Sequence, residues 1–154
     1  MKLDKRGTTE AEQNLKLVLK YNPSFFIGKS FEEQLIVAPS YISYKKVDHF
    51  SPIFDSFDAD IFWRKAFRNT NFHLEQEKIV SAIVESTNKN KTPIVVCDGD
   101  NLSMVVYADN HKTWSCDFCP CAEPNILQPI INVLKPYIGD MPLPTFFDCT
   151  MEND

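Results

Sequence analysis

The feature of this sequence that most restricts its fold is an apolar stripe at helical spacing between residues 71 and 86. Residues three or four positions apart lie on one face of a helix, and asparagine, present at position 71, is a favoured N-cap residue. The segment is therefore predicted to form an amphipathic helix with its apolar face against the core. The members of the stripe are Phe72, Ile79, Val80, Ile83 and Val84.

Short runs with the composition of β-strands lie on both sides of this helix. The turn Ala38-Pro39-Ser40 makes the first two runs a hairpin or one broken strand. The step Asp98-Gly99 favours a tight reversal, and residues 108–112 form a second turn, so the later runs are predicted to form an antiparallel meander. The runs are residues 34–37, 41–45, 61–63, 94–97, 102–107 and 113–118.

Two further helices are predicted near the ends of the chain. Residues 9–12 (TEAE) have the spacing of a capping box, and the apolar residues up to Leu19 then fall on one helical face until Asn22-Pro23 ends the pattern. Residues 125–137 carry a second stripe, in which Pro129 requires a late start or a bend. Residues 87–92 (TNKNKT) are polar and are predicted to form a surface loop.

Together these elements predict an α+β fold: an antiparallel β meander of about four to six strands packed with two to three α-helices. A chain of 154 residues suits one domain. We expect a helical N-terminal extension over residues 1–30, a core over residues 31–147 and a flexible tail over residues 148–154.

The sequence also predicts a cytoplasmic protein that crosses no membrane. No run approaches the roughly 18 apolar residues that a membrane helix needs, and the first residues are charged where a signal peptide is apolar. The chain has five cysteines, an odd number that fits reduced thiols better than a disulfide framework. We therefore expect all five to be free.

Charge is distributed unevenly along the chain. From residue 91 onward there are nine acidic residues and three lysines, within an overall net charge of −5. This balance argues against nucleic acid as the partner, because such binding needs clustered Lys and Arg. An acidic face would attract a basic protein, although an acidic surface also simply favours solubility. The residues that we expect to contact a partner are Asp55, Asp58, Asp60, Asp98, Asp100, Asp109 and Trp114.

No motif identifies a catalytic residue. The chain has no phosphate-binding glycine loop and no nucleophile elbow, and its histidines form no metal-binding pattern. Cys116, Cys119 and Cys121 are close enough in sequence to supply three zinc ligands, but no second cysteine pair supplies the fourth. Thiols buried as small apolar groups explain them better. We predict no catalytic residue, no cofactor and no metal.

Several stretches follow one another in an informative order. Residues 38–44 (APSYISY) come first and residues 61–67 (IFWRKAF) follow them. Residues 97–109, Trp114 and residues 120–137 come later, ahead of the apolar segment 142–147. In this order they resemble the early strand, aromatic strand, late hairpin, closing helix and tail of small immunity-type proteins of bacterial toxin–immunity systems. The resemblance covers about residues 35–147 and departs from that pattern in the motif CDFCPC and at Pro129.

The resemblance implies a stoichiometric inhibitor whose acidic, aromatic-rimmed surface blocks the active site of one cognate toxin domain. Toxins of such systems are often nucleases with basic clefts, which an acidic inhibitor would attract. No nucleic-acid or membrane partner is implied, and the oligomeric state stays open. The alternatives are a small ligand-binding protein or enzyme, which needs a concave apolar cavity, and a zinc-stabilised adaptor.

Overall fold

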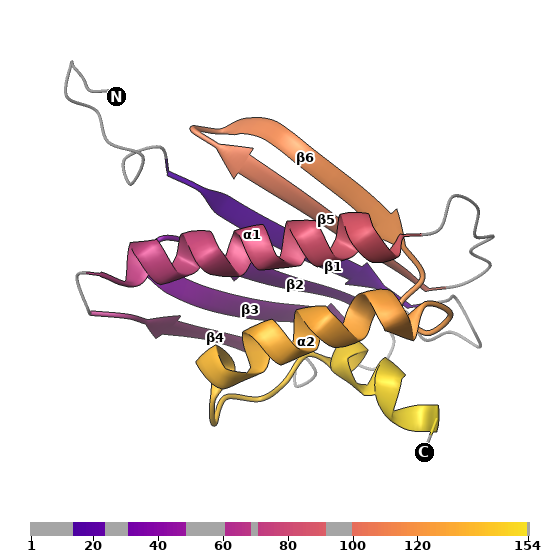
Figure 1. Cartoon of the computed structure of the whole chain (residues 1–154). Helices are drawn as coiled ribbons and strands as arrows, with labels where there is room; N and C mark the ends of the chain where they lie inside the picture. The colour runs from indigo at the N-terminus through magenta and orange to yellow at the C-terminus, as the bar shows by residue number, and fades with distance from the viewer. Residues whose placement is uncertain (1–13, 24–30, 49–60, 69–70, 92–99, 154) are drawn as a thin grey trace.

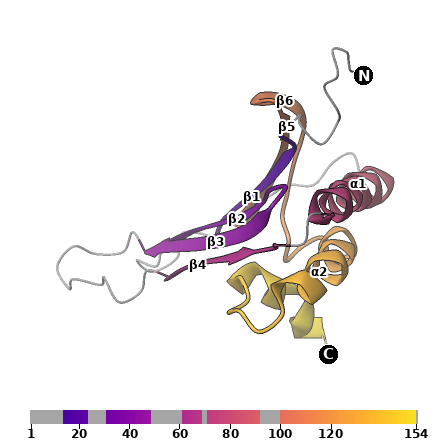
Figure 2. The same ribbon diagram turned by 90° about the vertical axis from the view of Figure 1, so that its left-hand side faces the viewer.

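The computed structural model describes residues 14–23, 31–48, 61–68, 71–91 and 100–153. The strands are β1 (Lys16–Asn22), β2 (Phe31–Val37), β3 (Tyr41–Asp48), β4 (Ile61–Ala66), β5 (Asn101–Ala108) and β6 (His111–Phe118). The helices are α1 (Phe72–Asn90), α2 (Pro124–Ile138) and the 3₁₀-helix η4 (Thr145–Asn153). The strands form one antiparallel sheet in the order β4-β3-β2-β1-β5-β6, and α1 and α2 cover one of its faces (Figures 1 and 2). The predicted α+β fold with a β meander is confirmed.

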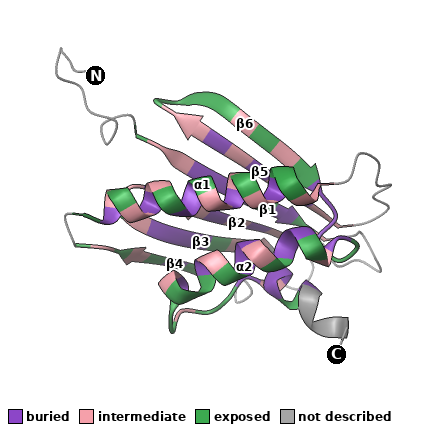
Figure 3. Cartoon of the chain, in the orientation of Figure 1, coloured by how far each residue is buried: buried purple, intermediate pink, exposed green. Residues whose placement is uncertain are grey.

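The core lies between the sheet and these two helices (Figure 3). Side chains alternate between the two faces of a strand, so every second residue of β1 and β5 points toward the helices. On the helices, the apolar stripe that predicted α1 is the surface that packs on the sheet. Buried residues of this layer include Leu17, Leu19, Leu102, Met104, Ile83, Ile126, Ile130 and Leu134.

Both long helices extend beyond their predicted bounds. The predicted loop over residues 87–92 is wrong for residues 87–90, because Thr87 is fully buried and continues the inward face of α1 by one more turn. Asn71 precedes α1 as expected, although its side chain makes no capping hydrogen bond. α2 starts early, at Pro124, and accommodates Pro129 within it. None of the helices in the described ranges is both long and apolar enough to cross a membrane.

Two tight turns set the register of the sheet. Residues on either side of Pro39 form the hairpin β2–β3, with the Ala38 N–H donating to the Tyr41 carbonyl at 2.9 Å. Between β5 and β6, Asp109 and Asn110 have φ angles of 54° and 70°, the left-handed pair that a two-residue hairpin favours. The predicted runs 34–37 and 41–45 therefore form a hairpin and not one broken strand. The predicted strand over residues 94–97 lies outside the described residues.

The predicted helical extension over residues 1–30 is wrong wherever the structure describes it. Residues 16–22 form β1, which pairs with β2 on one side and with β5 on the other. The spacing of Leu15, Val18 and Leu19 fits a helix, but Leu17, Leu19 and Tyr21 also alternate as a strand requires, and pairing on both sides outweighs a short local signal. The capping-box residues 9–12 lie outside the described residues.

Residues 145–153, which include most of the segment predicted to be a flexible tail, form η4. Phe146 and Phe147 are buried in the core, which fixes the start of this helix. Cys149 forms a disulfide with Cys121, just before α2. The start of η4, through Cys149, is therefore part of the packed domain.

Candidate functional site

The two faces of the sheet differ sharply within the described residues. One face lies under α1 and α2, whereas these helices leave the opposite face uncovered (Figure 2). We call the uncovered side of the sheet the open face. Strand register places one residue from each strand in a row across it. The central row is Asp117, Ser103, Lys20, Gln34, Lys45 and Phe62.

The next row of the open face is partly apolar. Val18 of β1 lies between Val105 of β5 and Ile36 of β2, and the row ends at Arg64 of the edge strand β4. Val18 is buried by its neighbours, while Ile36 and Val105 are half-buried. An apolar stripe thus crosses the open face beside the charged and polar central row.

The strands of the open face carry more basic than acidic side chains. Register and alternation assign five basic residues and two acidic residues to it among the described strands. This sign is opposite to the acidic overall charge of the chain. The basic residues are Lys16, Lys20, Lys45, Arg64 and Lys112, and the acidic residues are Glu32 and Asp117.

Aromatic side chains border the open face at β4. Phe62 is 63% exposed, and its neighbour Ile61 is 38% exposed at the start of the strand. The Arg64 guanidinium lies over the Tyr41 ring, 4.4 Å from its centroid, which holds the arginine in a cation–π contact. Exposed aromatic and arginine side chains are the types most enriched in protein interfaces.

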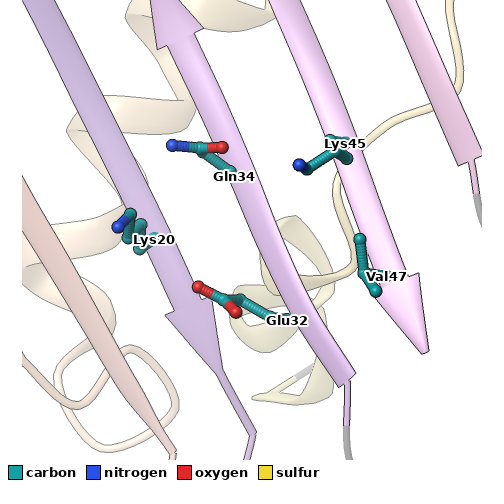
Figure 4. Close-up of a pocket in the computed structure, with 5 residues that line it drawn as sticks. All are labelled: Lys20, Glu32, Gln34, Lys45 and Val47. Atoms are coloured by element: carbon teal, nitrogen blue, oxygen red, sulfur yellow. The ribbon is translucent and has the colours of Figure 1, made fainter. Parts of the chain in front are cut away.

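A shallow groove of about 370 Å³ lies on the open face (Figure 4). Lys20, Gln34 and Lys45 stand side by side on three neighbouring strands, and Glu32 and Val47 complete the lining. Its lining combines two ammonium groups, one carboxylate and one amide. A groove of this chemistry suits charged or hydrogen-bonding groups better than an apolar ligand.

On the covered side, a buried carboxylate joins the tail to the sheet. Glu33 accepts hydrogen bonds from the Tyr44 hydroxyl, from the Thr145 backbone N–H at 2.7 Å and from the Thr145 hydroxyl at 2.6 Å. Burial raises the pKa of Tyr44 far above its ordinary value, and the hydrogen bond and negative charge of Glu33 add to this effect. Glu33 and Tyr44 are buried and Thr145 is half-buried, so we assign the cluster to stability.

The cysteines correct the prediction that all five are free. Cys121 and Cys149 are joined by a disulfide, and Cys119 is disulfide-bonded as well. Cys116 is a free thiol on β6, opposite Met104, and burial raises its pKa. Within the described residues, the group of possible metal ligands that contains Cys121 does not include Cys116. The prediction of free thiols rested on the odd number of cysteines, whereas a disulfide forms only between cysteines that the fold brings close together.

The predicted partner-contacting residues do not converge where the structure describes them. Asp100 precedes β5 and Asp109 follows it, which separates them by about 30 Å along an extended strand. Trp114 is half-buried and donates from its indole N–H to the Asn88 side chain of α1 at 3.2 Å. Asp55, Asp58, Asp60 and Asp98 lie outside the described residues. Sequence patterns alone do not reveal the open face, because they predict a helix where β1 supplies Lys16, Val18 and Lys20.

No protein-family model matches the chain, and no curated protein sequence matches it either.

Proposed function

We propose that this protein is an immunity protein, which binds one cognate bacterial toxin domain in the cytoplasm and inhibits it by stoichiometric contact. The observation that carries the proposal is the open face: a sheet surface with an apolar stripe, basic rows and a border that includes the exposed Phe62. A combination of apolar, aromatic and charged side chains on one surface is typical of specific protein interfaces.

The excess of basic side chains on the open face indicates the charge of the partner surface that it would bind. Because five basic residues oppose two acidic ones among the described strands, a partner with an acidic surface is favoured over one with a basic cleft. Lys20 and Lys45 would pair with carboxylates, while Val18, Ile36 and Val105 would lie under apolar side chains. We thus propose that inhibition uses this basic face and not the acidic residues expected from the sequence.

The groove supports a second candidate function, which is binding of a small polar molecule. Its volume of about 370 Å³ is within the range of ligand sites, and its two lysines would hold an anionic group. This candidate predicts that small anions compete for Lys20 and Lys45 without a protein partner.

The test is co-expression with a toxin domain encoded next to this gene. The proposal predicts that the protein restores growth and that the two chains purify as a complex of fixed stoichiometry. Absence of a neighbouring toxin gene, or failure to restore growth with a toxic neighbour, would overturn it.

Variants then identify the surface. Lys20→Glu combined with Lys45→Glu should abolish rescue, whereas Lys78→Glu combined with Lys89→Glu, on the exposed side of α1, should preserve it. Loss of rescue in the α1 variant alone would move the interface to the helical side.

A further inference from the structure

Three metal-binding side chains meet where the tail packs beside the end of the sheet. A carboxylate oxygen of Asp100 and the sulfur atoms of Cys121 and Cys149 all lie within 4.8 Å of one another. They come from separate parts of the chain: the residue before β5, the turn before α2, and η4. Their meeting is therefore a product of the fold.

We propose that these three residues form a Zn²⁺ site when the Cys121–Cys149 disulfide is reduced. Zinc is bound by thiolates at about 2.3 Å and by carboxylate oxygens at about 2.0–2.2 Å, usually in a tetrahedron. Such ligand atoms lie about 3.5–4 Å apart, so after reduction the two sulfurs have to move apart to this distance and the carboxylate has to approach them by about 1 Å. Because Cys121 is exposed, a water molecule completes the tetrahedron.

Two hydrogen bonds already orient the carboxylate. The backbone N–H of Cys121 and the hydroxyl of Tyr21 both donate to the same oxygen of Asp100, each at 3.4 Å. The same side chain supplies the carboxylate oxygen that lies within 4.8 Å of the two sulfurs. Partners of this kind fix the direction of a metal ligand and increase its affinity for the ion.

The disulfide and the zinc complex exclude each other. A dithiol reductant transfers two electrons and two protons to the bridge, which breaks the S–S bond, gives two thiols and leaves the reductant as a disulfide. Zn²⁺ then displaces the two thiol protons and forms two Zn–S bonds. Cytoplasmic thiols are kept reduced, so the zinc form would be the state of this site in the compartment proposed above.

Either state ties the tail to the body of the domain. In the oxidised state the bridge links η4 to the turn before α2, and in the reduced state the metal links the same two points and adds the residue before β5. The site lies apart from the residues that line the open-face groove, so zinc binding and partner binding can be tested separately.

The test uses the full chain in metal-free buffer, reduced with a phosphine, with ZnCl₂ as the probe and a chromophoric chelator as competitor. Reduced protein should bind one zinc ion at Cys121 and Cys149 with a Kd of about 1 µM or tighter, and oxidised protein at least about a hundredfold more weakly. Co²⁺ in place of zinc should give thiolate-to-metal absorption in the reduced protein. No stoichiometric zinc after reduction, or equal binding in both states, would overturn the proposal.

Four variants assign the ligands. Asp100→Asn should weaken zinc binding about tenfold while the disulfide still forms, and Cys121→Ser should abolish tight binding. Cys116→Ser is the matched control and should leave affinity unchanged, and Cys119→Ser should retain the metal. Unchanged affinity in Asp100→Asn, or loss of zinc in Cys116→Ser or Cys119→Ser with a retained far-ultraviolet circular dichroism spectrum, contradicts the assignment. Because Asp100→Asn keeps both thiols, it remains informative even if a cysteine variant fails to fold.

Discussion

The two faces of the sheet are built from the same strands but have different properties. On β1, Leu17 and Leu19 are fully buried under the helices, whereas Lys16 and Lys20 lie on the open face. The covered face also holds the Glu33 cluster, and the open face holds the groove and the exposed Phe62. Adjacent residues on one strand therefore lie in different environments, and our proposal assigns stability to the covered ones and recognition to the open ones.

The largest difference between the two faces is expected when two neighbouring residues of β1 are each replaced by alanine. Leu19→Ala should lower the free energy of unfolding by about 3 kcal/mol, because it removes a fully buried side chain and leaves a cavity. Lys20→Ala should change it by less than about 0.5 kcal/mol, as expected for a surface position. Urea denaturation measures both. Equal losses at the two positions would contradict the division between the faces.

The disulfide should stabilise the covered side by closing a long loop. Its two cysteines are separated by 28 positions, for which loop-closure entropy suggests about 3.6 kcal/mol. Cys121→Ser should lower the free energy of unfolding by about this amount in metal-free, oxidising buffer. In metal-free, reducing buffer the variant and the wild type should unfold at the same urea concentration; a persistent difference would show that the serine itself is destabilising.

Charge reversal should affect only the open face. Lys20→Glu with Lys45→Glu is expected to weaken toxin binding about a hundredfold at low salt, about tenfold for each charge, and the loss should shrink as salt is added. The urea midpoint should stay unchanged. Isothermal titration calorimetry at two salt concentrations checks this result, and a loss that is independent of salt would exclude an electrostatic role.

The smallest effect is expected at the Glu33 cluster. Tyr44→Phe removes the hydroxyl that donates to Glu33 and should cost about 1 kcal/mol of stability without changing partner affinity. The raised pKa of Tyr44 means that the folded protein keeps this proton longer than the unfolded chain does, so its contribution is complete below pH of about 10 and is lost as pH rises further. The variant should therefore lose less stability than the wild type between neutral and strongly alkaline pH. Equal alkaline losses would contradict this role.

The sequence predicts a helix, strand or turn correctly where the residue pattern fits only one of these structures. The stripe of α1 and the turn at Asp109 each agree with a single structure, and both are found. The apolar residues of β1 fit helical and strand spacing alike, so only pairing with β2 and β5, which are distant in sequence, decides between them. This error also hid the candidate site, because a residue's face on a sheet is defined only once its strand is assigned.

Cysteine chemistry shows the same limit. Cys116, Cys119 and Cys121 are close along the chain. However, Cys116 lies on β6 as a free thiol, whereas Cys121 lies in the turn before α2. Cys149 reaches Cys121 only because buried Phe146 and Phe147 fix the start of η4. Neither the bridge nor the position of Asp100 beside it is visible without the fold.

The central claim is that a partner binds the open face. Methyl NMR of the protein titrated with its cognate toxin domain tests it most directly, since β1 and its neighbours offer methyl groups on both faces. Signals of Val18, Ile36 and Val105 should shift strongly or broaden, while those of Leu17, Leu19 and Ile83 stay in place. Shifts confined to exposed residues of α1 and α2, with the three open-face signals unchanged, would contradict the claim.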